Sequence, residues 1–328
     1  MIGNPEMDGN PEMDGFAQRF DRLVANVSRV VQGKDQVVRA ALSCVLAEGH
    51  LLIEDVPGVG KTSLARAIAA SVALTWNRIQ FTPDLLPTDV TGVSVFDQAT
   101  SAFSFRPGPV FANIVLADEI NRASPKTQSA LLEVMQEHTV TTDATVYRVP
   151  RPFVVVATQN PIDLEGTYVL PEAQLDRFLM RIDIGYPGPE AEAQVLRSEK
   201  DEATVLHLSP IMTGSELLEM IEYVKRTVDV APAIENYIVS LCSHTRSLPE
   251  VRLGVSPRGG LALLRAARVV AAGAGRSYVT PDDIKSMAQP VLAHRILLRP
   301  DAEIQGRTPA EVVARALQAV PVPRTLVR

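Results

Sequence analysis

The chain has 328 residues, 46% of them hydrophobic, and at this length two packed units are expected rather than one. Its 38 acidic and 32 basic side chains leave a net charge of -6, which argues against a general nucleic-acid-binding protein. The cysteines, Cys44 and Cys242, form no CxxC pair, so we expect no disulfide framework, no zinc site and a cytoplasmic location. Without a signal pattern or an apolar run of roughly 18 residues, neither secretion nor membrane insertion is expected.

The N-terminal segment repeats one hexapeptide, Gly-Asn-Pro-Glu-Met-Asp, at residues 3–8 and again at 9–14. The repeat is rich in turn formers and poor in apolar residues, so residues 1–15 are predicted to be a disordered tail. Apolar residues at helical spacing then run from Phe16 to Val31 and, after Gly33, to Leu46. They predict two helices that face a core.

Three short apolar runs follow, at residues 50–56, 113–117 and 152–158, separated by segments of helical periodicity. This alternation predicts an α/β fold with three layers, in which helices cover both faces of a parallel sheet. Beyond Pro189 the strand signals stop, and capping patterns begin at Thr213, Thr280 and Thr308. We therefore predict an α/β core at residues 16–188 and an all-helical lid at 189–328.

A glycine-rich loop lies between the first apolar run and a helical segment, which is the context that a phosphate-binding loop needs. Its glycines let backbone N–H groups turn toward phosphates, Lys61 supplies positive charge, and Thr62 is a magnesium ligand. Asp55 replaces the first glycine of the general pattern, so its carboxylate is expected to point away from the phosphates. The predicted nucleotide-binding residues are Pro57, Gly58, Val59, Gly60, Lys61, Thr62 and Ser63, together with Asp118.

Two carboxylates, Asp118 and Glu119, end the second apolar run. Because side chains alternate along a strand, the strand must end there for the two to serve one site. We expect Asp118 to hold magnesium together with Thr62, and Glu119 to orient and deprotonate the attacking water. Asn160 ends the third run, where its amide can fix that water or the γ-phosphate. Alone, Asn160-Pro161 would be read as a turn.

These segments together resemble the MoxR family of AAA+ ATPases, and the resemblance covers most of residues 30–185. It rests on four stretches: Leu52 to Thr62, Gln80 to Pro87, Ala117 to Ala123 and Leu170 to Phe178. Asp55, unusual in the general loop, is normal for this branch. The resemblance continues more loosely to Arg328 and leaves out the repeated N-terminus.

The resemblance implies a ring, usually a hexamer, with each ATP site shared by two subunits. Arg177 matches the arginine finger offered to the adjacent subunit, Asn160 the sensor of the γ-phosphate, and Arg258 the second sensor at the start of a lid helix capped by Ser256. For Arg177, a surface salt bridge with Glu172 or Asp176 is the simpler alternative.

Two hairpins are also predicted. In one, Val93, Val95, Phe103 and Phe105 alternate around residues 97–102; the other spans residues 139–149. The tip of the second has an aspartate and no lysine, so nucleic-acid translocation is not expected. A purely structural role for this hairpin fits the sequence equally well.

The sequence thus predicts an ATP hydrolase that uses Mg2+, with ATP between core and lid. The family implies chaperone-like remodelling or activation of client proteins, often through proteins with a von Willebrand factor A domain. Two alternatives remain: the motor subunit of a magnesium-chelatase-like complex, and a slow nucleotide-dependent binding switch.

Overall fold

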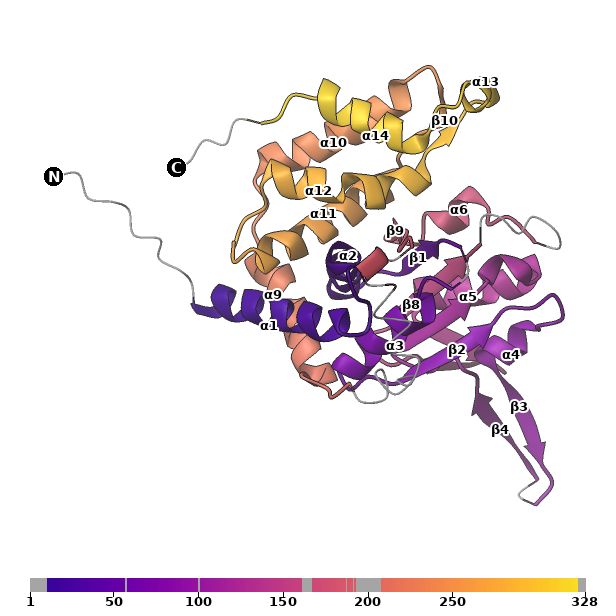
Figure 1. Cartoon of the computed structure of the whole chain (residues 1–328). Coiled ribbons are helices and arrows are strands. Elements are labelled where there is room, and N and C mark those ends of the chain that lie inside the picture. The colour runs from indigo at the N-terminus through magenta and orange to yellow at the C-terminus, as the bar shows by residue number, and fades with distance from the viewer. Residues whose placement is uncertain are drawn as a thin grey trace.

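The computed structural model describes residues 11–56, 58–99, 101–160, 167–186, 188–190, 192 and 208–323. Its central sheet has five parallel strands in the order β2-β5-β8-β1-β9 (Figure 1). Their bounds are β1 Leu51–Glu54, β2 Trp76–Gln80, β5 Ile114–Asp118, β8 Val154–Gln159 and β9 Met180–Ile182. The three predicted runs are the inner strands β1, β5 and β8, whereas the edge strands β2 and β9 were not predicted.

Side chains alternate between two apolar clusters on the two faces of the sheet. Leu51 and Ile53 of β1 face one cluster, whereas Leu52 faces the other. The first cluster holds α1 (Pro11–Ser28), α2 (Asp35–Leu46) and α3 (Lys61–Ser71); the second holds α5 (Pro125–Glu137). Burial on both faces explains why the inner strands are continuously apolar. The predicted three-layer α/β fold is confirmed.

The lid consists mainly of helices, and α11 and α12 pack against each other at its centre. The predicted capping boxes at Thr213, Thr280 and Thr308 are present. A short antiparallel ribbon, β10 with β11, departs from the all-helical prediction; its strands are too short to show a period of two in the sequence. The lid elements are α9 Gly214–Thr227, α10 Pro232–Ser247, β10 Val251–Leu253, α11 Pro257–Gly273, α12 Pro281–Leu292, η3 Ala293–Arg295, β11 Leu297–Leu298, α13 Pro300–Ile304 and α14 Pro309–Ala319.

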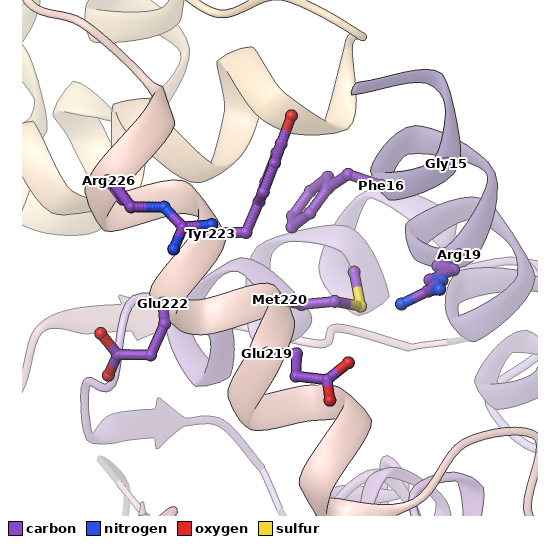
Figure 2. Close-up of a pocket in the computed structure, with 8 residues that line it drawn as sticks. All are labelled: Gly15, Phe16, Arg19, Glu219, Met220, Glu222, Tyr223 and Arg226. Atoms are coloured by element: carbon purple, nitrogen blue, oxygen red, sulfur yellow. The ribbon is translucent and has the colours of Figure 1, made fainter. Parts of the chain in front are cut away.

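The N-terminal helix begins earlier than predicted and joins the core to the lid. α1 starts at Pro11, and Met13, which lies in the predicted tail, is 1% exposed. The apolar contact of Met13 therefore extends the helix into the repeat. In Figure 2, Phe16 of α1 faces Tyr223 of α9, with ring centroids 6.2 Å apart. Residues 1–10 of the predicted tail lie outside the described residues, and the predicted boundary at residue 188 stays a prediction.

Both predicted hairpins are present. β3 (Gly92–Asp97) pairs with β4 (Ala102–Pro107), and this hairpin extends away from the body of the molecule on the side opposite the lid (Figure 1). β6 (Thr139–Thr142) pairs with β7 (Thr145–Arg148) directly after α5. The short helical segments of the core are α4 Pro87–Thr91, η1 Ile120–Arg122 and α6 Glu172–Leu175. Among the helices of the described residues, none is long and apolar enough to cross a bilayer.

Candidate nucleotide site

The phosphate-binding loop connects the carboxyl end of β1 to the first turn of α3. Gly58 and Gly60 have φ values of 84° and 94°, in the left-handed region that side chains rarely adopt, and Gly60 is the N-cap of α3. A Cβ at either glycine would have no atom within 4 Å, so open space lies beside the loop. Lys61, Thr62 and Ser63 form the first turn of α3, whose N–H groups are suited to bind phosphate oxygens. Val59 is buried, and Pro57 lies outside the described residues.

The carboxylate of Asp55 anchors the start of the loop to the segment after β9. Its Oδ2 accepts hydrogen bonds from the backbone N–H groups of Ile184, at 2.7 Å, and Gly185, at 2.6 Å. Its Oδ1 accepts from the N–H of Val56 at 2.7 Å. A glycine at this position could not tie the start of the loop to the segment after β9. Asp55 is therefore a structural part of the site.

Lys61 lies between the ends of β1 and β8. Its Nζ donates to the carbonyl of Asp55 at 2.6 Å and to that of Gln159 at 3.5 Å. Burial lowers the pKa of Lys61, while the carboxylates of Asp55, Asp118 and Glu119 oppose this shift. These carbonyl contacts occupy the ammonium donors that phosphate oxygens would otherwise take.

The two carboxylates at the end of β5 have different hydrogen-bond partners. β5 ends at Asp118, and Glu119 adopts a left-handed conformation with φ 56°. Such strain in a non-glycine residue is concentrated at functional sites. The Thr158 hydroxyl links the pair: it donates to Asp118 Oδ1 at 2.6 Å and accepts from the Glu119 N–H at 2.9 Å.

Two residues on the edge strand β2 complete this cluster, and the sequence did not single them out. Arg78 pairs with Asp118 Oδ2, with Nη2 at 2.6 Å and Nε at 3.1 Å. Gln80 donates to Glu119 Oε2 at 3.0 Å, and the Arg122 Nε lies 3.4 Å from the same oxygen. Gln80 begins one of the family-like stretches, whereas Arg78 lies outside all four of them.

Asn160 follows β8 directly and is 8% exposed. β8 lies between β5 and β1, so Asn160 leaves the sheet between the carboxylates and the phosphate-binding loop. The carboxyl ends of neighbouring parallel strands form one edge, where ligands bind in such sheets. The structure therefore brings Lys61, Asp118, Glu119 and Asn160 to one edge.

Arg177 and Arg258 lie at the opposite edge, which is formed by the amino ends of the strands and is called the amino edge below. Both line a cavity of about 320 Å³ together with Glu48, His50 and Arg265. His50 precedes β1, whereas the phosphate-binding loop follows it, and the four residues of β1 span about 13 Å. Arg258 therefore lies with Arg177 at the end of the sheet opposite the phosphate-binding loop of its own chain, and its role as second sensor stays a prediction.

Arg177 does not form the predicted alternative salt bridge. Its Nη1 donates to the Ala173 carbonyl at 2.7 Å, and its buried Nε has no hydrogen-bond partner among the residues that the structure describes. Glu172 pairs with Arg252 instead, and Asp176 with Arg295. Within the described part of the chain, the Arg177 guanidinium is therefore held by a backbone carbonyl and not by a carboxylate.

Comparison with known proteins identifies similar families and relatives. Residues 50–180 match the ATPase family associated with various cellular activities (AAA), and residues 243–316 match the AAA lid domain. Chaperone MoxR1 of Mycobacterium tuberculosis is 42% identical over 93% of this chain and 82% of its own length. An uncharacterized protein of Bacillus subtilis, YeaC, is 47% identical over 92% of this chain and 94% of its own.

The fold agrees with these matches. The crystal structure of a proposed ATPase from Cytophaga hutchinsonii superposes with a TM-score of 0.88 at 36% identity, covering 96% of this chain and 98% of the other. A core with a phosphate-binding loop, a helical lid and close relatives named MoxR all agree with the resemblance seen in the sequence. The chain belongs to the MoxR family of AAA+ ATPases.

Proposed function

We propose that this chain is a magnesium-dependent ATPase that works as a ring and remodels or activates client proteins. The observation that carries the proposal is the separation of two groups of side chains. Lys61, Asp118 and Glu119 lie at the carboxyl edge of the sheet, whereas Arg177 and Arg258 lie at the amino edge. If the carboxyl edge of one copy faced the amino edge of another, both groups of side chains would meet in one site.

At the carboxyl edge, the residues present fit ATP and magnesium. The first-turn N–H groups of α3 and Lys61 would hold the phosphates, and Thr62 and Asp118 would ligate the metal. The described residues contain no cluster of three or more His, Cys, Asp or Glu side chains suited to a metal, so oxygens of the nucleotide would complete its shell. When bound, magnesium offsets negative charge on the phosphates.

Hydrolysis then depends on Glu119 and Asn160. Glu119 would orient a water and accept its proton, after Gln80 and Arg122 release the carboxylate oxygen that they share. Asn160 would hydrogen-bond the γ-phosphate or the attacking water. Asn160 follows β8, the strand next to β1, and Glu119 follows β5, the strand on the far side of β8.

The proposal of a ring rests on Arg177 and Arg258, which would act on the ATP of a neighbouring subunit. A guanidinium placed on the phosphates of a neighbour stabilises the charge of the transition state, an effect of about a thousandfold or more in rate. Arg177 is suited to this role because the neighbouring carboxylates, Glu172 and Asp176, pair with other arginines, and Arg258 in the same cavity would assist it. A single subunit alone should hydrolyse ATP poorly.

The client proposal has its support in the β3–β4 hairpin. Phe96 and Phe103 are 49% and 73% exposed, and their rings lie 5.2 Å apart on this projecting element. Exposed aromatic side chains favour contact with proteins. A relative with the name Chaperone MoxR1 agrees with a chaperone role, and we expect partners with a von Willebrand factor A domain, as the family implies. A trapped Glu119→Gln ring should retain such partners in a pull-down.

Mixing two inactive variants tests the shared site. Arg177→Ala subunits keep their own Glu119, and Glu119→Gln subunits keep their own Arg177, so a mixed ring contains some complete interfaces. Its ATPase activity should exceed that of either variant alone. Mixed rings that demonstrably form yet restore no activity, with Arg177→Ala itself inactive, would place the arginine within its own subunit and contradict the proposal. The same experiment with Arg258→Ala tests the second arginine.

A further inference from the structure

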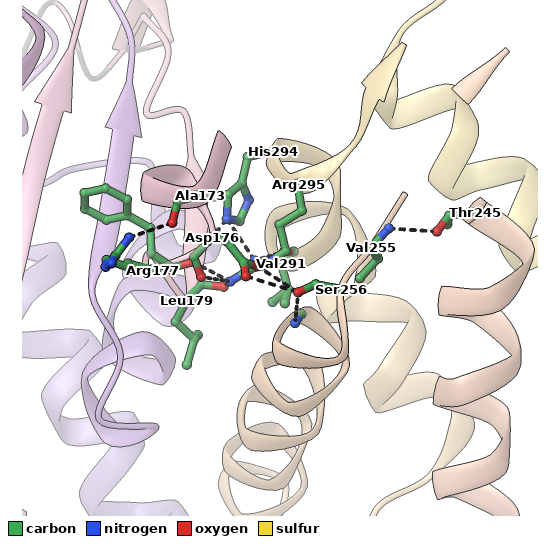
Figure 3. Close-up of polar contacts among 12 residues, drawn as sticks. Ala173, Asp176, Arg177, Leu179, Thr245, Val255, Ser256, Val291, His294 and Arg295 are labelled. Carbon is green, nitrogen blue, oxygen red and sulfur yellow. Dashed lines mark hydrogen bonds and ion pairs between the residues drawn. The ribbon is translucent and has the colours of Figure 1, made fainter. Parts of the chain in front are cut away.

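The turn that carries Arg177 is tied to the lid by its neighbour, Asp176. Arg295 of the lid donates its Nε to Asp176 Oδ1 at 2.8 Å. Ser256 donates its hydroxyl to the same carboxylate, at 3.2 Å to Oδ1 and 3.1 Å to Oδ2. Figure 3 shows these contacts converging on Asp176 from two lid segments, one before α11 and one after α12.

Arg295 is nearly enclosed and uses its donors on the same turn. Its side chain is 2% exposed, and it donates to the carbonyls of Asp176, Phe178 and Leu179 at 3.3, 2.5 and 3.3 Å. Arg295 also contacts the carbonyl of Val291 within the lid. Burial lowers the pKa of Arg295, and the Asp176 carboxylate opposes this shift. The guanidinium thus holds the backbone on both sides of Arg177.

Neighbouring elements of the lid hold Ser256 and Arg295, the two lid residues that contact Asp176, close to each other. The β10–β11 ribbon joins the segment before α11 to the segment after η3, so Ser256 and Arg295 are held near each other. A Cβ at Gly259, in the first turn of α11, would meet the Arg295 Cδ at 2.8 Å, so the helix packs directly on this side chain. Ser256 also accepts from the Gly259 N–H at 3.2 Å and so caps the helix that carries Arg258.

We infer that Arg295 and Asp176 are positioning residues, which hold Arg177 and Arg258 as one unit that moves with the lid. The inference rests on the proposed shared site. It adds that the lid of one subunit sets the geometry of the ATP site of its neighbour. A displacement of about 1 Å in a reacting group can lower a rate about a hundredfold, so a loosened turn should have a large effect on hydrolysis.

The test compares Arg295→Met with a matched control, Arg276→Met. Arg276 forms a bidentate pair with Asp283, at 2.8 and 2.6 Å, inside the lid and away from the Arg177 turn. Each variant removes an arginine from its carboxylate partner, so both should lower the unfolding temperature. Only Arg295→Met should lower kcat, by about tenfold to a hundredfold, while its ATP affinity stays within about twofold of the parent.

Rescue across the interface separates positioning from general damage. Arg295→Met subunits mixed with Glu119→Gln subunits should regain activity, because the ATP site of the Arg295→Met subunit is intact. If Arg295→Met does not fold, Arg295→Lys takes its place: a single ammonium keeps the charge on Asp176 but cannot hold the three carbonyls, so kcat should still fall.

Three outcomes overturn the inference or its basis. Equal changes in kcat for the Arg295 and Arg276 variants, or no rescue in mixed rings, would mean that the Asp176–Arg295 pair only stabilises the fold. Parent-like activity of Arg295→Met and Arg295→Lys, with Arg177→Ala inactive, would remove the positioning role and leave the shared site standing. Parent-like activity of Arg177→Ala would instead contradict the proposed function itself.

Discussion

The two edges of the sheet are built in different ways. At the carboxyl edge, Glu119 directly follows β5 and Asn160 directly follows β8, while Lys61 begins the helix after the loop that leaves β1. At the amino edge, the turn that carries Arg177 is held through Asp176 by Ser256 and Arg295, which lie 79 and 118 positions beyond Arg177 in the chain. The carboxyl edge therefore follows from local motifs, whereas the surroundings of Arg177 depend on contacts between distant segments.

The largest expected effect is a loss of kcat on substitution of Glu119 at the carboxyl edge. Glu119→Gln removes the base but keeps the shape of the side chain, so kcat should fall about a hundredfold to ten-thousandfold. Binding of a fluorescent ATP analogue should stay near the parent value. Lys61→Ala is the contrast, because it removes the charge opposite the phosphates and should weaken binding itself. A Glu119→Gln protein that turns over ATP like the parent, or that folds without binding ATP, would remove Glu119 from this role.

The amino edge should respond to pH through His50. Burial lowers its pKa from 6.5 to about 4, with a smaller contribution from His138. Its Nδ1 accepts from the Val155 N–H at 3.0 Å, which requires the neutral ring, whereas the contact of its Nε2 with the Met135 carbonyl at 3.0 Å opposes the lowering of the pKa. The unfolded chain takes up this proton first, so stability is present above pH 6.5 and is lost as the pH falls toward 4.

Denaturant unfolding from pH 8 to pH 4.5 measures this loss. The His50 contribution amounts to at most about 3 kcal/mol. His50→Gln, which cannot titrate, should lose less stability than the parent over this range, whatever its stability at pH 8. Parallel curves for the two proteins would show that His50 does not carry the acid sensitivity.

A smaller effect, on magnesium binding, is expected from substitution of Arg78, which forms an ion pair with Asp118. Its side chain is 48% exposed, so the ion pair contributes at most about 1 kcal/mol. Arg78→Ala should therefore lower the magnesium concentration that half-saturates nucleotide binding by up to about fivefold. The control is Arg66→Ala, which removes an equal charge from the Trp76 ring on the same strand. The same change in both variants would reduce the Arg78 effect to net charge.

No effect is expected from DNA. The chain is acidic overall, and the β6–β7 tip, with Asp143 next to Thr142, has no lysine. Neither duplex nor single-stranded DNA should stimulate hydrolysis at physiological salt. Strong stimulation that disappears as salt rises would replace the client-protein proposal with nucleic-acid translocation.

The sequence predicted what depends on contiguous residues. The inner strands, the loop from Asp55 to Thr62 and both hairpins follow from apolar runs and turn residues, whose physics is local. The edge strand β2 escaped prediction because Arg78 and Gln80, at its solvent-facing positions, interrupt the apolar pattern. Met13 shows the reverse case: a segment with a disordered composition becomes helical because a distant core buries one side chain.

The sequence by itself determined the family, the fold class and the carboxyl-edge residues, because each motif sits within a few positions of a strand end. Only the tertiary structure decided that Arg258 lies with Arg177 rather than at the phosphates, and that Asp176 meets Ser256 and Arg295. Those contacts depend on how the lid packs on the sheet. No periodicity records such packing, since it is set by the summed burial of many apolar side chains.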